Sequence, residues 1–371
     1  MFHRTIHRGV AGAASAMRSA LARAASGVAL VALASNCGGA PSVVAADPGA
    51  ISPPVSPLRS LASPQEIANS PLAMLEDGRL KRSASGCSGS DVDRGPNRRT
   101  SPDVVSQGTL FVADFTSTGP VEEFDAAGTN PNPYGSITTG LDTPYGMAVD
   151  KSGTLYVTNN NPNNVKEYPQ GASSPTVSLN YQVLAPMAVG IDPAQNVYVV
   201  NDRGGPIVIF PPGQTMPSGY LSGFYYPTDV AWDSAGNLYV VDHLYPGKPH
   251  QGAVLKFKPG ATKGVSLKLQ SLWYPTGVVI DKNNDVIVSN LGNNTITEYA
   301  PGATVSKRTI TAGICDPVYM AVNSSDDVFV ANDGSNLVTM YKPTLKQPSA
   351  TLTKDLKALR GLAINPKLKA P

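Results

Sequence analysis

The chain has little charge and almost no imbalance of charge. Its 371 residues include 29 Lys and Arg and 27 Asp and Glu, so the net charge is +2 and the charged fraction is 15%. Binding to a phosphate backbone depends on clustered basic residues that release counterions. Here the basic residues are scattered along the sequence. We therefore expect no nucleic-acid partner.

Long apolar runs and the common catalytic motifs are also missing. A membrane-spanning helix needs about 20 apolar residues, and no stretch of the chain reaches that length. The sequence has no nucleophile elbow, phosphate-binding loop, Cys-x-x-Cys pair or nucleotide-binding fingerprint. These motif-defined enzyme classes are therefore not indicated.

The N-terminus resembles an export signal. Residues 1–26 contain four arginines and no acid, and a short apolar run follows at 27–35. A basic flank, a short apolar core and small residues are typical of a secretory signal. We assign residues 1–37 to targeting and expect an exported protein, in the bacterial cell envelope or outside the cell.

Cys37 follows this segment and leaves two outcomes open. The run at 33–37 (LASNC) resembles the lipobox of bacterial lipoproteins, with Cys37 as the lipidated residue. It departs from that pattern because Leu33 lies one place too early and Asn36 directly precedes the cysteine. Either Cys37 carries a lipid, which would be the only membrane contact, or cleavage near residues 43–46 releases the protein.

Cysteine is scarce, with three in the chain. If Cys37 is lipidated or removed, Cys87 and Cys315 are the only pair left. An exported protein can form a disulfide, so Cys87–Cys315 is a candidate bridge, and two free thiols are the alternative. Residues 38–105, which hold Cys87, are rich in Pro, Ser, Ala and Gly and are expected to form a disordered spacer.

The chain does contain one five-residue motif that is repeated six times. It reads LFVAD, LYVTN, VYVVN, LYVVD, VIVSN and VFVAN, beginning at residues 110, 155, 197, 238, 286 and 328 at intervals of 45, 42, 41, 48 and 42. A period of this length with several strand signals per repeat is typical of a β-propeller with one blade per repeat. We therefore expect an all-β propeller over residues 106–371.

Each repeat predicts four strands. The first strand is an apolar run that usually begins with proline, the second is the recurring five-residue motif, and the fourth is short. The third strand ends in an aromatic residue that we expect in the core between blades: Phe124, Tyr168, Phe210, Phe257, Tyr299 and Tyr341. The first repeat lacks a first strand, whereas residues 360–365 at the other end form a first strand without a second. Pairing of 360–365 with 110–114 would close a six-bladed ring and remove an open sheet edge.

Residues 144–150 (PYGMAVD) and 155–159 (LYVTN) carry a family resemblance. They resemble the Pro-x-Gly-x-Ala-Val-Asp and Leu-Tyr-Val-x-Asp elements of NHL repeats, which form six-bladed propellers. The run at 156–159 is also similar to the YVTN propeller family, which is seven-bladed and therefore ranks second. The resemblance implies the fold and leaves the activity open, because propellers host many functions.

Residues that break the repeat are better site candidates than residues that recur. The Asp or Asn residues that end the six copies of the motif together resemble a ring of metal ligands, but we expect each residue to cap a turn of its own blade. If the first-to-second turns mark one face of the ring (the turn face), the second-to-third and fourth-to-first loops share the other (the loop face). The non-repeating candidates for ligand binding on the loop face are Tyr145, Tyr225, Tyr226, Asp229, His243, His250, Trp273, Tyr274, Tyr319 and Arg360.

These residues favour a binding module over an enzyme. Aromatic side chains with a few charges suit a protein, peptide or glycan ligand, and we expect a monomer that needs no cofactor. The alternative is a divalent-metal-dependent enzyme similar to the Ca²⁺-dependent lactonases or the lyases built on six-bladed propellers. For that alternative, Asp229 and Asp316 are the candidate metal ligands, since Ca²⁺ prefers oxygen. His243 and His250 lie seven residues apart, a spacing that matches no common metal motif.

Overall fold

A computed structural model describes residues 72, 108–127, 132–202, 204–244, 250–354 and 356–366. The predicted signal segment, Cys37 and Cys87 lie outside the described residues. Of the predicted spacer, Leu72 alone is described. Within the described residues, no helix is long and apolar enough to span a membrane.

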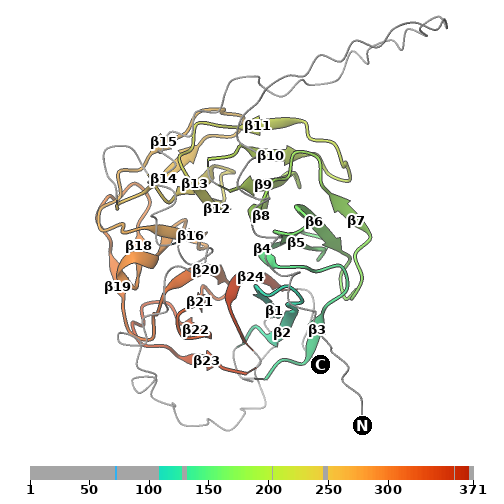
Figure 1. The fold of residues 1–371 in the computed structure, drawn as a ribbon. Helices are drawn as coiled ribbons and strands as arrows, with labels where there is room; N and C mark the ends of the chain where they lie inside the picture. Colours follow the sequence, from blue (N-terminus) through green and yellow to red (C-terminus); the bar gives the residue numbers. More distant parts are fainter. Residues whose placement is uncertain are drawn as a thin grey trace, which may run out of the picture. The chain divides into compact units, whose positions relative to one another are not determined.

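The described chain forms six four-stranded antiparallel sheets arranged around a central channel (Figure 1). This confirms the all-β propeller and its six blades, and it excludes the seven-bladed alternative. Blade 1 is β4–β7, and blades 2, 3, 4 and 5 follow as β8–β11, β12–β15, β16–β19 and β20–β23. The first strand of each blade is innermost and the fourth is outermost.

The strands match the predicted four per repeat. The first strands are β4 Pro144–Val149, β8 Pro186–Ile191, β12 Pro227–Trp232, β16 Pro275–Ile280 and β20 Pro317–Val322. The second strands are β5 Leu155–Asn159, β9 Val197–Asn201, β13 Leu238–Asp242, β17 Val286–Asn290 and β21 Val328–Asn332. The third strands are β6 Asn164–Tyr168, β10 Ile207–Phe210, β14 Ala253–Phe257, β18 Thr295–Tyr299 and β22 Leu337–Tyr341. The fourth strands are β7 Val177–Leu179, β11 Gly219–Leu221, β15 Val265–Ser266, β19 Arg308–Ile310 and β23 Ala350–Leu352. One 3₁₀ turn, η1 Leu291–Asn293, follows β17.

The ring closes through a mixed blade, as the sequence predicts. It consists of β24 Leu359–Asn365, β1 Thr109–Asp114, β2 Val121–Asp125 and β3 Gly135–Ile137. In β24 and β1, Ile364 pairs with Leu110 and Leu362 with Val112. The two ends of the repeat region therefore share one sheet, and β24 covers the edge of β1 that would otherwise be unpaired.

The aromatic residues that end the third strands are all buried, with exposures of 0–2%. Their tyrosines also satisfy their hydroxyl groups locally. The Tyr168 hydroxyl donates to the Thr139 carbonyl oxygen at 2.8 Å, and the Tyr341 hydroxyl donates to that of Ala312 at 2.6 Å. Burial of a ring with a satisfied hydroxyl stabilises the sheet without leaving an unpaired polar group.

The Asp or Asn at the end of each second strand holds the loop that enters the same blade. Asn159 Oδ1 accepts the Asp142 N–H at 3.2 Å, and Asn290 Oδ1 accepts the Trp273 N–H at 3.1 Å. The same bond, always 17 residues back, recurs in blades 2, 3 and 5 from Asn201, Asp242 and Asn332. A second, main-chain bond of the same offset occurs in blades 1 to 5, for example from Leu291 N–H to the Tyr274 carbonyl, and the equivalent bond of the mixed blade runs from Phe115 N–H to the Ala358 carbonyl. We call this pair of bonds the loop clamp.

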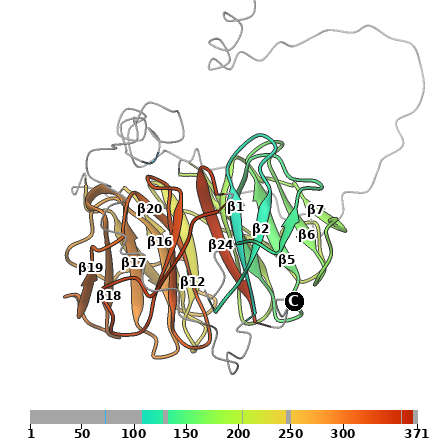
Figure 2. The ribbon, with the colours of Figure 1, turned by 90° about the horizontal axis from the view of Figure 1, so that it is seen from below.

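Close packing of the first strands explains why glycine recurs at their third position. A Cβ on Gly146 would lie 2.5 Å from the Ala188 Cα, and a Cβ on Gly361 would lie 2.2 Å from the Tyr145 carbonyl oxygen. Neighbouring inner strands therefore approach too closely for a side chain at these sites. Figure 2 shows these inner strands running between the two faces of the ring.

Cys315, in the fourth-to-first loop of blade 5, is disulfide-bonded. Its partner lies outside the described residues, where the chain has Cys37 and Cys87. The Cys87–Cys315 pairing therefore stays a prediction, whereas the alternative of a free Cys315 thiol is wrong for this structure.

Arg360, predicted as a ligand-binding residue, lies inside the protein beside the seam. Its side chain is 3% exposed and forms an ion pair with Asp333 of blade 5 at 3.0 Å. Its guanidinium group also lies 5.1 Å from the centre of the Phe115 ring and 5.5 Å from that of Tyr145 in blade 1. Arg360 thus joins the mixed blade to both neighbours instead of presenting a charge to solvent.

Replacing Arg360 should therefore weaken the whole ring. We expect Arg360→Met to lower the free energy of unfolding by about 3 kcal/mol, because Asp333 keeps a buried charge without its cation. The double variant R360M/D333N should recover at least half of the loss. Urea unfolding followed by circular dichroism measures both.

The matched control is Lys282→Met, which breaks an ion pair with Asp326 whose lysine is 64% exposed. This control should cost less than about 1 kcal/mol, because solvent screens exposed pairs. An equal cost for R360M and K282M would contradict the seam role of Arg360.

Candidate functional site

The loop clamp places one equivalent residue of each of blades 1 to 5 at the same position on the loop face, two residues before the first strand, and Lys357 occupies that position in the mixed blade. These residues are Asp142, Leu184, Tyr225, Trp273, Cys315 and Lys357 in blades 1 to 5 and the mixed blade. In the neighbouring blades 2, 3 and 4 this position is apolar. Leu184 is 63% exposed, Trp273 is 41% exposed and Tyr225 is half-buried. We call Leu184, Tyr225 and Trp273 the apolar arc.

Trp273 is fixed by contacts on several sides. The imidazole of His250 stacks on its ring with centroids 5.4 Å apart and planes tilted by 20°. Its carbonyl oxygen accepts the Gly292 N–H at 3.1 Å, and a Cβ on Gly292 would lie 2.2 Å from the indole. An exposed tryptophan held in one orientation loses little conformational freedom when it binds a partner.

The long loop between β13 and β14 explains how His250 reaches this position. In other blades an asparagine side chain from the second-to-third loop accepts the N–H of the residue before the next first strand, as Asn294 does for Asp316 at 2.7 Å. In blade 3 the His250 carbonyl oxygen takes this role and accepts the Tyr274 N–H at 2.7 Å. The longer loop thus makes the usual contact and adds an imidazole beside Trp273.

The two predicted histidines have different environments. His250 is exposed, and its Nδ1 lies 2.5 Å from the Tyr274 hydroxyl. His243 is fully buried between the rings of Tyr226 and Tyr274, and its Nδ1 donates to the Pro275 carbonyl oxygen at 3.0 Å. Burial lowers the pKa of His243 to about 4, so the ring is neutral at physiological pH. His243 supports the loop from below, and only His250 meets solvent.

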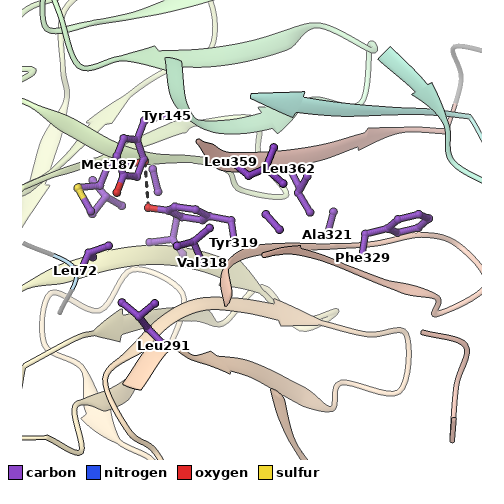
Figure 3. Packing of buried hydrophobic residues seen from close by; sticks show 14 of the residues in the cluster. Leu72, Tyr145, Met187, Leu291, Val318, Tyr319, Ala321, Phe329, Leu359 and Leu362 are labelled. Atoms are coloured by element: carbon purple, nitrogen blue, oxygen red, sulfur yellow. Dashed lines mark hydrogen bonds between the residues drawn. The ribbon is translucent and has the colours of Figure 1, made fainter. Parts of the chain in front are cut away.

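Three predicted aromatic residues also lie in the interior. Tyr145 and Tyr226 have no exposed surface and Tyr319 is 5% exposed. The Tyr319 hydroxyl crosses the channel from blade 5 and lies 3.0 Å from the Thr228 carbonyl oxygen and 3.3 Å from that of Met187 (Figure 3). Tyr319 therefore closes the central channel near the loop face.

Leu72 adds to this closure. It is 1% exposed and belongs to the same apolar cluster as Met187, Leu291 and Tyr319, as Figure 3 shows. Met187 and Leu291 lie where first strands begin and second strands end, which is the loop face. Among the described residues, apolar side chains thus fill the centre of the loop face, and exposed apolar side chains lie in the arc around it.

The two predicted metal ligands are not part of a chelating cluster. Among the described residues, neither Asp229 nor Asp316 belongs to a group of three His, Cys, Asp or Glu side chains close enough to share an ion. Asp316 has a φ of 46°, and its N–H and carbonyl oxygen are both used in contacts between loops. The Asp229 carboxylate accepts the N–H groups of Val230 and Val278, each at 2.9 Å.

A different acidic group, Asp281, Asp285 and Glu298 in blade 4, has the spacing of a metal site. Two of its three acids are already paired with basic side chains. Lys307 pairs with Asp285 and with Glu298, the latter at 2.9 Å, and Arg308 pairs with Glu298 at 2.5 Å. An ion would have to displace these cations, so this group is explained as an ion-pair network.

Leu184 is the site residue that the sequence did not predict. It is a lone leucine in a loop, and single exposed apolar residues are common. Its importance follows from its position, because it is the blade 2 equivalent of Trp273 and both donate their N–H groups to a second-strand asparagine. Alignment of the six fourth-to-first loops against the first-strand prolines would have found it.

Comparisons with known proteins agree with the fold. An NHL repeat model matches residues 272–299, which confirms the predicted resemblance for the segment that carries Trp273. A search of curated proteins found no match. Among solved structures, a chain described as "Crystal structure of Nidogen/Laminin Complex" is similar with a TM-score of 0.59 and 16% identity, over 69% of this chain and 98% of that one. Because 1283 chains of solved structures match this one, the likeness identifies the propeller fold and not its activity.

Asp242 is the one acid among the loop clamps of blades 1 to 5, where the other four have asparagine. It is fully buried and accepts the N–H groups of Tyr225 and Tyr226. Burial raises the pKa of Asp242 to about 7, although these hydrogen bonds oppose the shift. The folded protein therefore holds an extra proton here between about pH 4 and 7, and its stability falls as the pH rises through that window.

Asp242→Asn should remove this pH dependence. We expect the variant to be more stable than the wild type at pH 8, by about 1–2 kcal/mol, because no buried charge has to form. Near pH 4.5 the two should differ little. The reverse change in the adjacent blade, Asn201→Asp, serves as the matched control and should lose stability at pH 8. Urea unfolding at both pH values decides, and a D242N variant that is less stable at pH 8 would refute the assignment.

Proposed function

We propose that the chain is a non-catalytic binding module that takes a protein partner on the apolar arc of its loop face. The observation that carries this proposal is the run of Leu184, Tyr225 and Trp273 on three adjacent blades, with two of the three well exposed. The other half of the ring has Asp142 and Lys357 at the same position, and Cys315 there is buried. The apolar surface is thus confined to one side of the loop face.

The chemistry of the arc favours a protein over the other ligands that the sequence allows. Protein interfaces are organised around rigid aromatic anchors such as Trp and Tyr, with polar groups at the rim. Trp273 has the support expected of such an anchor, and Leu184 extends the surface with an aliphatic side chain that offers no hydrogen bond to a glycan. NHL-repeat propellers are common protein-binding modules, which is consistent with this choice.

The N-terminal segment adds a location to the proposal. A signal sequence over residues 1–37 would export the propeller, and a lipid on Cys37 would hold it at the cell envelope with residues 38–105 as the tether. A protein partner would then be met outside the cytoplasm. Free secretion after cleavage is the alternative to the lipid.

The Ca²⁺-dependent enzyme reading has no specific support. Among the described residues, Asp229 and Asp316 share no ion-binding group with a third acid. The closely spaced acids of blade 4 are paired with Lys307 and Arg308. The arc itself contains no acid, base or nucleophile in position to act on a substrate.

The double variant L184S/W273S tests the proposal. The full-length chain would be immobilised and used to capture protein from an envelope extract, and the captured protein would then be titrated against each variant. Loss of these two exposed anchors should weaken binding at least about thirty-fold, because central aromatic residues contribute about 2 kcal/mol or more to an interface.

Val305→Ser is the matched control, since Val305 is 61% exposed and lies on the turn face. It should bind like the wild type. Equal binding by the wild type and L184S/W273S, with both folded by circular dichroism, would rule out the arc as the contact surface.

A further inference from the structure

The Tyr319 side chain crosses the channel near the loop face, and we call it the Tyr319 bar. Below this side chain the central channel is hollow. A cavity of about 250 Å³ is lined by the first strands of several blades, including residues 146–149, 188–191, 229–232 and 278–280. Tyr319 is part of its wall at the loop-face end. The bar and the cavity together make a pocket that is closed at one end of the channel.

The pocket opens toward the turn face. The last residue of five of the six lining strands is only half-buried, which places solvent at that end; these residues are Val149, Ile191, Trp232, Ile280 and Val322. Because all five are apolar, the entrance has an apolar wall. The loop face and its apolar arc lie at the opposite end of the strands.

Of the described residues that line this wall, Asp229 is the only one with a carboxyl group, and none is Lys, Arg or His. It occupies the third position of β12, where three other blades have glycine. Each of its oxygens accepts one backbone N–H, from Val230 and Val278, so the second lone pair of each oxygen is left for another donor. Its side chain spans the gap to blade 4 and also borders the cavity.

Among the residues that the structure describes, no cationic side chain pairs with Asp229. Its pKa is raised to about 7 by burial, and the opposing contributions come from the two backbone N–H groups alone. A buried carboxylate without a cation is costly, and a bound cation would lower that cost. The arrangement therefore favours a ligand that brings its own positive charge.

We propose that the channel pocket binds a small organic amine, which enters from the turn face with its ammonium group at Asp229 and its apolar body against the strand ends near Trp232. This site is independent of the protein partner proposed for the apolar arc. It would make the propeller a sensor or carrier for an amine, separate from its contact surface.

The size of the pocket limits the ligand class. Sites for drug-sized ligands measure about 300–1,000 Å³, so 250 Å³ suits a molecule of about ten non-hydrogen atoms and excludes a folded peptide or an oligosaccharide. One carboxylate suits one ammonium group. Apolar walls without another charged side chain disfavour zwitterions such as free amino acids, whose carboxylate would be left without a partner.

The test uses 2-phenylethylamine as the probe and 2-phenylethanol as its uncharged equivalent, titrated into the full-length chain at pH 8. The chain has two tryptophans, Trp232 and Trp273. In a Trp273→Phe background, Trp232 is the sole indole and reports occupancy of the pocket by fluorescence. We expect saturable binding of the amine and at least about tenfold weaker binding of the alcohol.

Asp229→Asn should weaken amine binding at least about tenfold and leave alcohol binding unchanged. Because this change also affects the bond to Val278, Ala231→Leu provides a second variant that fills the pocket and keeps the carboxylate. It should abolish binding of both probes. Equal affinity for amine and alcohol, amine binding that D229N leaves intact, or displacement of the amine by millimolar Ca²⁺ would each overturn the proposal.

Discussion

The loop clamp is the constraint on which the rest of the molecule depends. A side-chain oxygen at the end of a second strand and the next main-chain N–H together hold the loop that enters the same blade. The clamp acts against local strain, because in five of six blades the residue before the first strand has a φ of 42–51°. Such backbone costs about 1–2 kcal/mol per residue outside glycine, so it persists only where other bonds hold it.

Because the clamp repeats, differences between blades become visible on the surface. Each clamp presents one side chain at an equivalent place on the loop face, and the blades differ only in which residue this is. The apolar arc is therefore a consequence of sequence choice on a fixed framework. The long loop after β13 keeps the framework intact, since the His250 carbonyl replaces an asparagine, and it adds the ring that supports Trp273.

Buried charges mark the other places where the repeat is broken. Arg360 and Asp333 neutralise each other at the seam, whereas Asp242 is held by backbone N–H groups alone. Asp229 is similar to Asp242 in its hydrogen bonds but also borders a cavity. The same chemical group thus has a structural role at the end of β13 and, in the proposed amine site, would receive a cation on β12 of the same blade.

Much of the fold could be predicted from the sequence, because strand periodicity and turn chemistry repeat six times. The seam followed from the missing strand at each end, and β24 pairs with β1 as expected. The site was less predictable. Whether Tyr319 lines the channel mouth or crosses it depends on the distance to the opposite blades, which no local pattern encodes.

Arg360 and Leu184 are two residues whose environments could not be predicted from local sequence. A charged residue in a loop-rich region was expected to face solvent, but Asp333 and two aromatic rings draw Arg360 inside. Leu184 was not predicted as a site residue, because its role depends on Tyr225 and Trp273 in the neighbouring blades. Predictions from local sequence fail where the partner lies in another repeat.

Hydrogen exchange of the blade 4 loop is the most direct test of the clamp. In Asn290→Ala the Trp273 N–H loses its acceptor, so the account predicts at least about tenfold faster exchange of the Trp273 and Leu291 amides, the two donors of the clamp, in a protein that remains folded. Asn283→Ala, in the first-to-second turn of the same blade, should leave these amides protected. Unchanged exchange in the Asn290 variant would mean that the loop is held by something other than the clamp and would contradict the account.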